Sequence, residues 1–324
     1  MKLTLDEMRE AARAVYRVMP PTPQYAWPLL ARLAGCEVWV KHENHTPIAA
    51  FKVRGGIVYV GELCARAPDC PGVVAATRGN HGQSIALAAA RHGLRCVIVV
   101  PEGNNPEKND AMAAQGAALV VRGADFQQAL EHAQALAEAE GLHMVPSFDR
   151  LLVMGVASYA LELFEGAGPL DAVYVPIGLG SGICGVIAAR DALGLTTEVI
   201  GVQAEGAPAY ALSFAAGRPV STDRADTFAD GVATRVPVAE AVEFINRGAA
   251  RVVTVSDDDI LDAQRALLRA THNLAEPAGA APLAALLSER ARMRARKVAV
   301  ILSGGNADAA NIRMLAATDS HARA

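Results

Sequence analysis

The sequence predicts an α/β protein with largely parallel sheets. Short runs rich in Val and Ile alternate with longer Ala-rich stretches along the 324 residues, the order of strands and helices in such proteins. Several Val/Ile runs are continuous, without apolar/polar alternation, so we expect strands covered on both faces by helices. Apolar residues make up 52% of the chain and aromatic residues only 5%. The core must therefore be large and mainly aliphatic.

Eight strands and five helices can be placed from these patterns. The expected strands are Glu37–Lys41, Gly72–Ala76, Arg95–Val100, Ala118–Arg122, Asp171–Ile177, Glu198–Gln203, Arg251–Val255 and Lys297–Leu302. Four helices are expected at His81–His92, Pro106–Gln115, Phe126–Glu140 and Asp257–Thr271. Near the N-terminus, Thr4 and Glu7 form a capping-box pattern, which predicts a fifth helix and argues against a signal peptide.

Composition excludes several classes of protein. The net charge is −4 with both signs spread along the chain, whereas a nucleic-acid surface needs clustered positive charge. The five cysteines are scattered without a CxxC pair, so neither a zinc site nor a disulfide framework is indicated. No apolar run approaches the ~20 residues of a membrane helix. We expect a soluble cytoplasmic protein.

A lysine stands in an unusual place after the first strand. Lys52 lies between Phe51 and Val53 at the start of an expected helix, where the helix dipole disfavours positive charge. That position and partial desolvation would lower the pKa of the amine, as a Schiff-base lysine requires. The alternative is a lysine whose stem packs while its head reaches solvent.

Three further loops follow strands, where ligands bind in open α/β sheets. Thr77–Gln83 opens a helix and would offer N–H groups to a carboxylate or phosphate; an ordinary capping turn is the alternative. Gly178–Gly185 is a glycine loop before a helix, typical of an anion site. It also matches the G-x-G-x-x-G dinucleotide fingerprint at Gly180–Gly185, with Glu205 as the ribose-binding acid. Ser303 places a hydroxyl after the last strand, unless Ser303–Gly305 is merely a turn.

Together these loops resemble the serine/threonine dehydratase and serine racemase family, pyridoxal-phosphate enzymes of fold type II. The resemblance runs from about Thr22 to Asn306 and includes the lysine motif Phe51–Gly55. It implies that Lys52 is the Schiff-base lysine and that Phe51 flanks it. It further implies that the phosphate is held by Gly178, Leu179, Gly180, Ser181 and Gly182, that Asn80 and Ser303 contact the cofactor ring, and that the substrate carboxylate lies against Thr77, Arg78, Gly79 and His81.

The resemblance also implies an activity and a domain organisation. The expected reaction is β-elimination from L-threonine or L-serine, giving a 2-oxo acid and ammonia, with 3-hydroxyaspartate and β-phenylserine as alternative substrates. We expect a small domain at 45–146 that carries the lysine, and a large domain at 1–44 and 147–324, with the cofactor in the cleft. A homodimer is the family expectation, and a C-terminal regulatory domain is not expected.

The chain departs from the family pattern at Arg78, where the family usually has Ser or Ala. We hypothesise that Arg78 binds a carboxylate of the substrate, which would favour 3-hydroxyaspartate; a salt bridge to Asp230 or another acid is the alternative. Some relatives bind Mg²⁺ or Ca²⁺. Glu205 and the Ala209 carbonyl match that site, but Ala211 replaces its aspartate, so we expect weaker metal binding.

Two other activities compete with this interpretation. One is β-replacement within the same cofactor chemistry, which the Phe51–Gly55 motif disfavours. The other is an NAD(P)-dependent oxidoreductase built on Gly180–Gly185, which leaves the lysine, Thr77–Gln83 and Ser303 segments unexplained.

Overall fold

The chain folds into two compact units in the computed structural model, which describes residues 1–317. Unit 1 comprises Met1–Pro21 and Thr46–Ala160, and unit 2 comprises Thr22–His45 and the residues from Leu161 onward. The sequence analysis assigned residues 1–21 and 147–160 to the larger domain instead. An ion pair of 2.6 Å between Arg150 Nη2 and Glu7 Oε1 contributes to holding these two segments within unit 1.

Unit 1 is built on a four-stranded parallel sheet with the order β5-β4-β3-β6. Its strands are β3 (Val73–Ala76), β4 (Cys96–Val100), β5 (Ala118–Val121) and β6 (His143–Met144), and its helices are α1 (Leu5–Tyr16), α3 (Lys52–Arg66), α4 (Asn80–Arg91), α5 (Pro106–Ala114), α6 (Phe126–Glu140) and the first part of α7 (Arg150–Ala167). Thr4 and Glu7 form the predicted capping box before α1.

Both faces of the central strands β3 and β4 of the unit 1 sheet are buried. Val73 and Ala75 belong to a cluster with apolar residues of α3 and α4, and Val74 and Ala76 belong to a second cluster with Ala129 and other residues of α6. Successive strand residues point to opposite faces, so an uninterrupted apolar strand fills both cores. The prediction of doubly covered strands is confirmed here.

Unit 2 contains a six-stranded sheet with the order β1-β2-β10-β7-β8-β9, in which only β1 is antiparallel to its neighbour. The strands are β1 (Gln24–Ala26), β2 (Glu37–His42), β7 (Ala172–Pro176), β8 (Glu198–Ala204), β9 (Arg251–Val255) and β10 (Lys297–Leu302). The helices are α2 (Pro28–Ala34), α8 (Ser181–Ala192), α9 (Ala209–Ala216), α10 (Ala239–Gly248), α11 (Asp257–Thr271), α12 (Pro277–Ser288) and α13 (Ala309–Ala316), with short 3-10 turns η1 (Glu43–His45) and η2 (Asp230–Val232).

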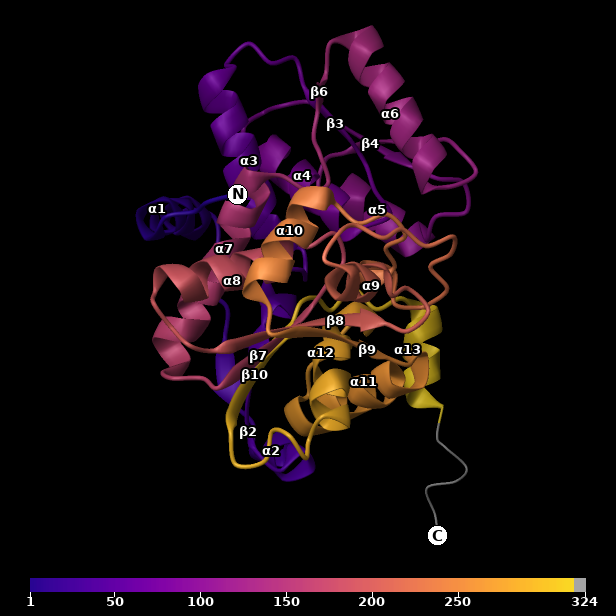
Figure 1. Ribbon diagram of the computed structural model, residues 1–324. Coiled ribbons are helices and arrows are strands. Elements are labelled where there is room, and N and C mark those ends of the chain that lie inside the picture. Colours follow the sequence, from indigo (N-terminus) through magenta and orange to yellow (C-terminus); the bar gives the residue numbers. More distant parts are fainter. Residues whose placement is uncertain (318–324) are drawn as a thin grey trace. The chain divides into compact units, whose positions relative to one another are not determined.

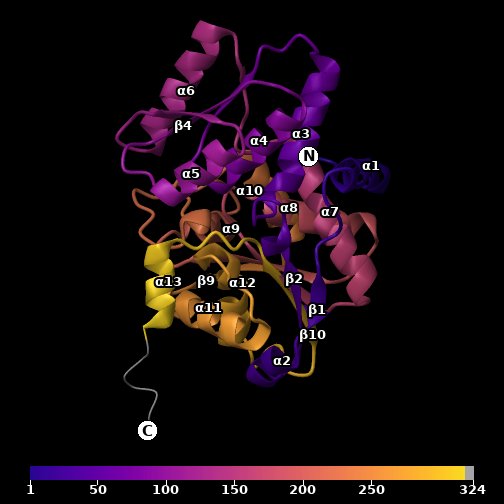
Figure 2. The same ribbon diagram turned by 180° about the vertical axis from the view of Figure 1, so that it is seen from behind.

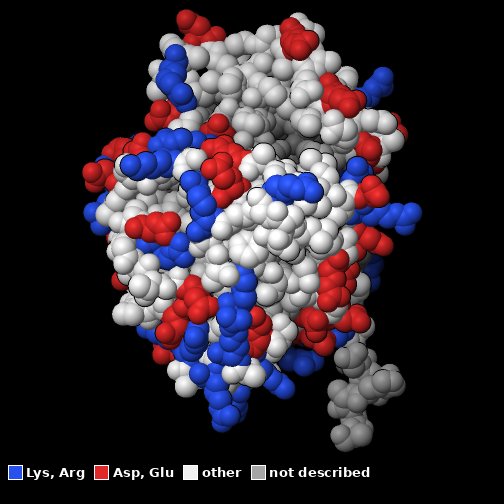
Figure 3. All heavy atoms as spheres, viewed as in Figure 1, with Lys and Arg blue, Asp and Glu red and all other residues white. Residues whose placement is uncertain are grey.

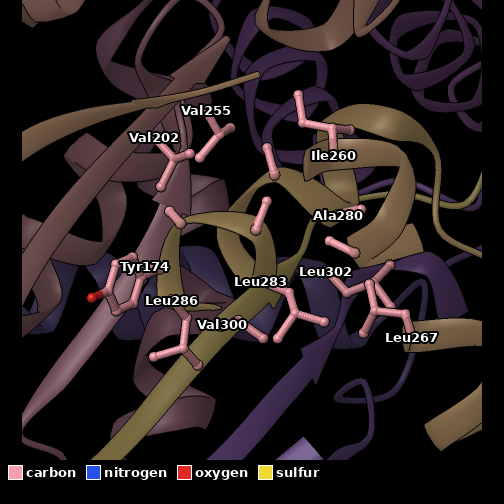
Figure 4. Packing of buried hydrophobic residues seen from close by; sticks show 14 of the residues in the cluster. Tyr174, Val202, Val255, Ile260, Leu267, Ala280, Leu283, Leu286, Val300 and Leu302 are labelled. Carbon is pink, nitrogen blue, oxygen red and sulfur yellow. The ribbon is translucent and has the colours of Figure 1, made fainter. Parts of the chain in front are cut away.

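Helix α12 forms the centre of the main core of unit 2. It packs across β7, β8, β9 and β10 on one face of the sheet, whereas α8 covers β7 and β8 on the other (Figure 1). Its Leu283 and Leu286 lie among Tyr174, Val300 and Leu302 of the sheet (Figure 4). Helices α11 and α13 lie side by side (Figure 2), joined by a hydrogen bond of 2.9 Å between Gln264 and Asn311.

All eight predicted strands and all five predicted helices are present, and no predicted end is shifted by more than one residue. The structure adds β1 and β6, which have only three and two residues. On the face shown in Figure 3, basic and acidic side chains are intermixed. Within residues 1–317, no helix is long and apolar enough to cross a membrane.

Candidate functional site

Lys52 is the first residue of α3 in unit 1, as the sequence predicted. Its backbone carbonyl accepts a hydrogen bond of 2.6 Å from Ser84 Oγ on α4. Its ammonium nitrogen lies 4.7 Å from the centre of the Phe51 ring, and Phe51 in turn contacts Tyr159 edge to face. The half-buried Lys52 therefore has its amine near an aromatic ring and its backbone at a helix start, where the dipole disfavours positive charge.

Glycines bring three helix backbones into direct contact around the start of α3. A Cβ added at Gly55 would lie 2.8 Å from the Leu152 carbonyl oxygen of α7, and one at Gly155 would lie 2.2 Å from the Arg54 carbonyl oxygen. A Cβ at Gly56 would collide with α4. Contacts below 3.0 Å leave no room for a side chain, so α4 and α7 hold the backbone next to Lys52 closely.

The loop between β3 and α4 leads into a helix whose N-terminus has no side-chain cap. Buried Thr77 accepts a hydrogen bond of 3.1 Å from the Gly79 N–H through its hydroxyl, which fixes the turn. Helix α4 begins at Asn80, and no side chain caps its N-terminus. An uncapped N-terminus presents its first N–H groups, and the positive end of its dipole, to an anion.

Two buried nitrogens in this segment lack protein partners. His81 Nε2 and Gln83 Nε2 have no hydrogen-bond partner within residues 1–317. Burial, and then the charge of Lys52, lowers the pKa of His81 to about 3, so its imidazole is neutral near pH 7. An unpaired buried polar group costs roughly 1–3 kcal/mol, and a polar ligand bound at this loop would remove that cost.

Arg78 is exposed, and its backbone carbonyl accepts a hydrogen bond of 3.3 Å from Asn104 Nδ2. No acidic side chain in the described part of unit 1 forms an ion pair with its guanidinium. The stem of Lys108 on α5 covers the next residue, because a Cβ at Gly79 would lie 3.2 Å from Lys108 Cδ. The loop therefore contains one cationic residue, Arg78, and a second, Lys108, lies directly over it.

In unit 2, the glycine loop Gly178–Gly182 and Ser303 follow neighbouring parallel strands. The pairing of Val300 with Tyr174 places Leu302 opposite Pro176. Because the carboxyl ends of parallel strands meet at one edge of the sheet, the residues that follow β7 and β10 share that edge. The structure thus brings Ser303 and the glycine loop to the same edge of unit 2.

The glycine loop is closely packed from behind. A Cβ at Gly178 would lie 2.5 Å from the Gly231 carbonyl oxygen. Gly180 caps α8 with φ +102, and a Cβ there would lie 2.9 Å from Ala241 Cβ. Ser181 is buried and opens α8, which has no side-chain cap. This loop has the form of an anion site made of backbone N–H groups.

Ser303 is only 4% exposed and directly follows β10. The Gly304 carbonyl accepts a hydrogen bond of 3.0 Å from the N–H of Glu276, the residue before α12. A Cβ at Gly279 would lie 2.6 Å from that same oxygen. The turn after β10 is therefore held against the start of α12, and the position of the Ser303 hydroxyl follows from it.

Comparison with known proteins identifies the family of this chain. Residues 15–304 match the family model described as "Pyridoxal-phosphate dependent enzyme". The chain is 33% identical over 307 residues to the L-threonine ammonia-lyase of Thermotoga maritima, covering 94% of this chain and 76% of that one.

The chain belongs to the pyridoxal-phosphate dependent enzyme family.

Other relatives match most of the chain. It is 31% identical to the catabolic L-threonine dehydratase of Escherichia coli K12, covering 97% of this chain and 96% of that one. It spans only 57% of the biosynthetic L-threonine dehydratase of Pasteurella multocida. The structure of processed threonine deaminase isoform 2 from Solanum lycopersicum superimposes with a TM-score of 0.89 and 29% identity, covering 97% of this chain and 94% of that one. The predicted fold class, fold type II, is thereby confirmed.

The residues present fit the family's cofactor, pyridoxal phosphate. Within unit 1, Lys52 has a half-buried side chain with an amine that can form a Schiff base. Within unit 2, the glycine loop has an uncapped helix start of the kind that binds a phosphate, and Ser303 has a buried hydroxyl that can form a hydrogen bond. The family match spans the Gly180–Gly185 fingerprint as well, so the NAD(P) alternative has no support.

The residues of the expected metal site lie after β8 and at the start of α9. Glu205 is exposed after β8, and the Ala209 carbonyl accepts a hydrogen bond of 2.6 Å from Ser213 Oγ. In the described part of the chain, no group of three or more His, Cys, Asp or Glu side chains is arranged to hold a metal ion.

Three residues that shape these loops were missed by the sequence analysis. Ser84 binds the backbone of Lys52, and Tyr210 and Thr234 bind carbonyls of the glycine loop. Each is a common residue type within or beside an ordinary segment, and no local pattern marks it. Only the fold reveals these contacts.

Proposed function

We propose that this protein is a pyridoxal-phosphate dependent ammonia-lyase that dehydrates and deaminates a small β-hydroxy amino acid, with L-threonine and L-serine as first candidates. The observation that carries the proposal is Lys52, held by its backbone at the start of α3, in a chain 33% identical to an L-threonine ammonia-lyase. The uncapped start of α4, a suitable carboxylate site, lies in the same unit.

Each loop has one role in this proposal. Lys52 binds the cofactor covalently through its ε-amine, with Phe51 and Asn80 beside it. The backbone of Gly178, Leu179, Gly180, Ser181 and Gly182 binds the phosphate, and Ser303 hydrogen-bonds the ring nitrogen. Thr77, Gly79 and His81 surround the substrate carboxylate, for which the N–H groups of an uncapped helix are suited.

The reaction needs a base, an anion site and an electron acceptor. Pyridoxal phosphate, when bound, would supply the acceptor for the electrons released as the substrate Cα–H bond breaks. The Lys52 amine, free of the cofactor while substrate is bound, would take that proton, while the start of α4 would hold the carboxylate in place. Neutral His81 adds no charge beside the amine. Loss of the β-hydroxyl as water, followed by hydrolysis, yields one 2-oxo acid and one ammonia per amino acid.

A product assay tests this proposal. The holoenzyme is incubated with L-threonine and with L-serine, and 2-oxo acid and ammonia are measured together. We expect equal amounts of both products, and a fall of at least about 10³-fold in rate for Lys52→Ala, as for the loss of a positioned base. Release of neither product from a panel of β-hydroxy amino acids that includes β-phenylserine would contradict the proposal.

Arg78 favours a second candidate substrate, 3-hydroxyaspartate. The residue is exposed in the Thr77–Gln83 segment and has no acidic partner in the described part of its unit. Its guanidinium is suited to bidentate binding of a carboxylate, and the neighbouring Lys108 adds positive charge. A substrate with a second carboxylate would compensate the charge of Arg78.

Substrate preference in Arg78 variants tests this role. We expect Arg78→Ala to lower kcat/KM for 3-hydroxyaspartate by roughly 10–100-fold relative to threonine, because a charge-assisted hydrogen bond is worth about 1.5–3 kcal/mol. Arg78→Lys should keep part of the preference. An unchanged ratio of the two kcat/KM values in Arg78→Ala would remove Arg78 as a selector.

We further propose that the protein acts in amino-acid catabolism in the cytoplasm and forms a homodimer. The near-complete mutual coverage with a catabolic relative supports the first part, and the family expectation supports the second. Light scattering of the purified holoenzyme should give about twice the mass of 33.8 kDa; a monomer would contradict it.

A further inference from the structure

The glycine loop of unit 2 is held by two buried hydroxyl groups. Tyr210 on α9 donates a hydrogen bond of 2.8 Å to the Leu179 carbonyl, and Thr234 donates one of 3.0 Å to the Gly178 carbonyl. Tyr210 is 1% exposed and Thr234 7% exposed. Two successive carbonyls of the loop are therefore directed into the protein.

This orientation fixes the direction of the N–H groups that follow. In a planar trans peptide, the carbonyl of one residue and the N–H of the next point in opposite directions. With the Gly178 and Leu179 carbonyls bound from behind, the N–H groups of Leu179 and Gly180 must point away from Tyr210 and Thr234. In the described part of the chain, no backbone carbonyl accepts from either N–H.

These N–H groups adjoin the start of α8, whose first N–H groups have no side-chain cap. A concave set of backbone N–H groups at a helix start is the arrangement that binds a phosphate. If either carbonyl turned outward, its oxygen would face the phosphate in place of an N–H and repel it. The two hydroxyls thus determine which sign of charge the loop accepts.

Tyr210 is held in position by a side chain of strand β8. Buried Gln203 near the end of β8 accepts hydrogen bonds from the N–H groups of Tyr210 and Ala211, at 2.8 and 3.0 Å, and so fixes the start of α9. The Tyr210 hydroxyl also accepts a bond of 3.1 Å from the Val238 N–H. Burial raises the pKa of Tyr210, so the hydroxyl keeps the proton that it donates to Leu179.

We propose that Tyr210 and Thr234 are positioning residues for the cofactor phosphate: they bind the Leu179 and Gly178 carbonyls and thereby turn the loop N–H groups toward the phosphate. The proposal rests on the proposed role of the glycine loop. It explains how this loop can carry Leu179 between Gly178 and Gly180, because its shape is set by the two hydroxyls rather than by glycine alone.

Comparing two forms of the cofactor tests the proposal. The apoprotein of the wild type, of Tyr210→Phe and of Thr234→Val is titrated with pyridoxal phosphate and with pyridoxal, which lacks the phosphate. Each variant should lose about tenfold in affinity for pyridoxal phosphate, the effect of one hydrogen bond of about 1–1.5 kcal/mol, with an unchanged affinity for pyridoxal. The ³¹P chemical shift of the bound cofactor should change as well.

Two further variants separate positioning from general damage. Thr234→Ser keeps the hydroxyl and should restore the phosphate affinity and the ³¹P shift. Tyr174→Phe also removes a buried tyrosine hydroxyl from unit 2, one that bonds Glu289 at 2.5 Å and does not contact the loop. It should leave the affinities for both cofactor forms unchanged. If Tyr210→Phe does not fold, the comparison of Thr234→Val with Thr234→Ser still tests the positioning role.

The outcomes distinguish this proposal from the one on which it rests. If the wild type prefers pyridoxal phosphate over pyridoxal but no variant changes that preference, the positioning role is overturned and the role of the loop stands. If a variant loses affinity for both forms equally, the positioning role is overturned too. If the wild type binds both forms equally, the phosphate role of the loop fails, and the positioning role fails with it.

Discussion

In unit 1 the start of α3 is held mainly by backbone packed against backbone, whereas in unit 2 the glycine loop is held by two side-chain hydroxyls in addition to close packing. Gly55 and Gly155 allow α7 to touch α3, so the segment around Lys52 is sensitive to any added atom. The Gly178 and Leu179 carbonyls depend on Thr234 and Tyr210, so the glycine loop is also sensitive to the loss of a single oxygen.

The difference matches what each element is proposed to hold. An amine that must bind and release the cofactor needs a fixed backbone and a mobile side chain, and close helix packing provides the fixed backbone. A phosphate needs several N–H groups with one orientation, which requires that the adjoining carbonyls be turned away. Steric fit therefore suits the lysine, and directional hydrogen bonds suit the loop.

The largest expected effect comes from adding an atom in unit 1. Gly155→Ala would place a Cβ 2.2 Å from the Arg54 carbonyl oxygen, and overpacking of this kind costs typically about 1–3 kcal/mol. Gly61→Ala on α3 is the control, because the nearest atom to its Cβ is 3.8 Å away. In urea unfolding, Gly155→Ala should be destabilised and Gly61→Ala should not. Equal stability of the two variants would contradict the claim that close backbone packing holds the start of α3.

A pH effect of intermediate size is expected from His81. Burial lowers its pKa to about 3 in the folded protein, against about 6.5 in the unfolded chain. Between these values the unfolded state binds more protons, so the free energy of unfolding falls as the pH decreases, by up to about 1.4 kcal/mol per pH unit.

Replacing His81 isolates its share of this pH dependence. His42 in unit 2 has a pKa lowered to about 4, first by burial, and contributes a similar loss of stability below about pH 6.5. His81→Gln should reduce the slope between pH 4 and 6, and His81→Gln with His42→Gln should reduce it further. An identical slope in wild type and His81→Gln, measured by urea unfolding at each pH, would contradict the burial of a neutral imidazole.

The smallest effect should follow the loss of a hydroxyl in unit 1. Ser84→Ala removes the hydrogen bond to the Lys52 carbonyl, but that carbonyl lies in the first turn of α3, and packing against α7 remains. We expect about 1 kcal/mol or less in stability and no change in cofactor affinity, in contrast to Thr234→Val. A tenfold loss of cofactor affinity in Ser84→Ala would show that unit 1 also depends on hydroxyl positioning.

Much of the fold was predictable because it is encoded locally. Continuous Val/Ile runs identified the eight long strands, and caps identified helix starts such as that of α1. Strands β1 and β6 are too short to show a periodicity. The assignment of residues 1–21 to unit 1 depends partly on the contact of Glu7 with Arg150, which is 143 residues distant, and no local pattern encodes such a contact.

The site was predictable only in part, for the same reason. Lys52 could be identified because a lysine at an expected helix start is unusual, and the glycine loop because several glycines follow an expected strand. Tyr210 and Thr234 bond carbonyls 31 and 56 residues away, and the orphaned nitrogens of His81 and Gln83 become apparent only once their surroundings are packed. Directional contacts between distant segments are properties of the fold.

The most direct measurement locates the cofactor on the chain. The holoenzyme is reduced with borohydride, digested, and analysed by mass spectrometry for the lysine that carries the pyridoxyl group. The chain contains five lysines, at positions 2, 41, 52, 108 and 297, and buried Lys41, which is ion-paired with Glu162, serves as an internal control. We predict the pyridoxyl group on Lys52 alone; its presence on any of the other four, with Lys52 unmodified, would contradict the assignment.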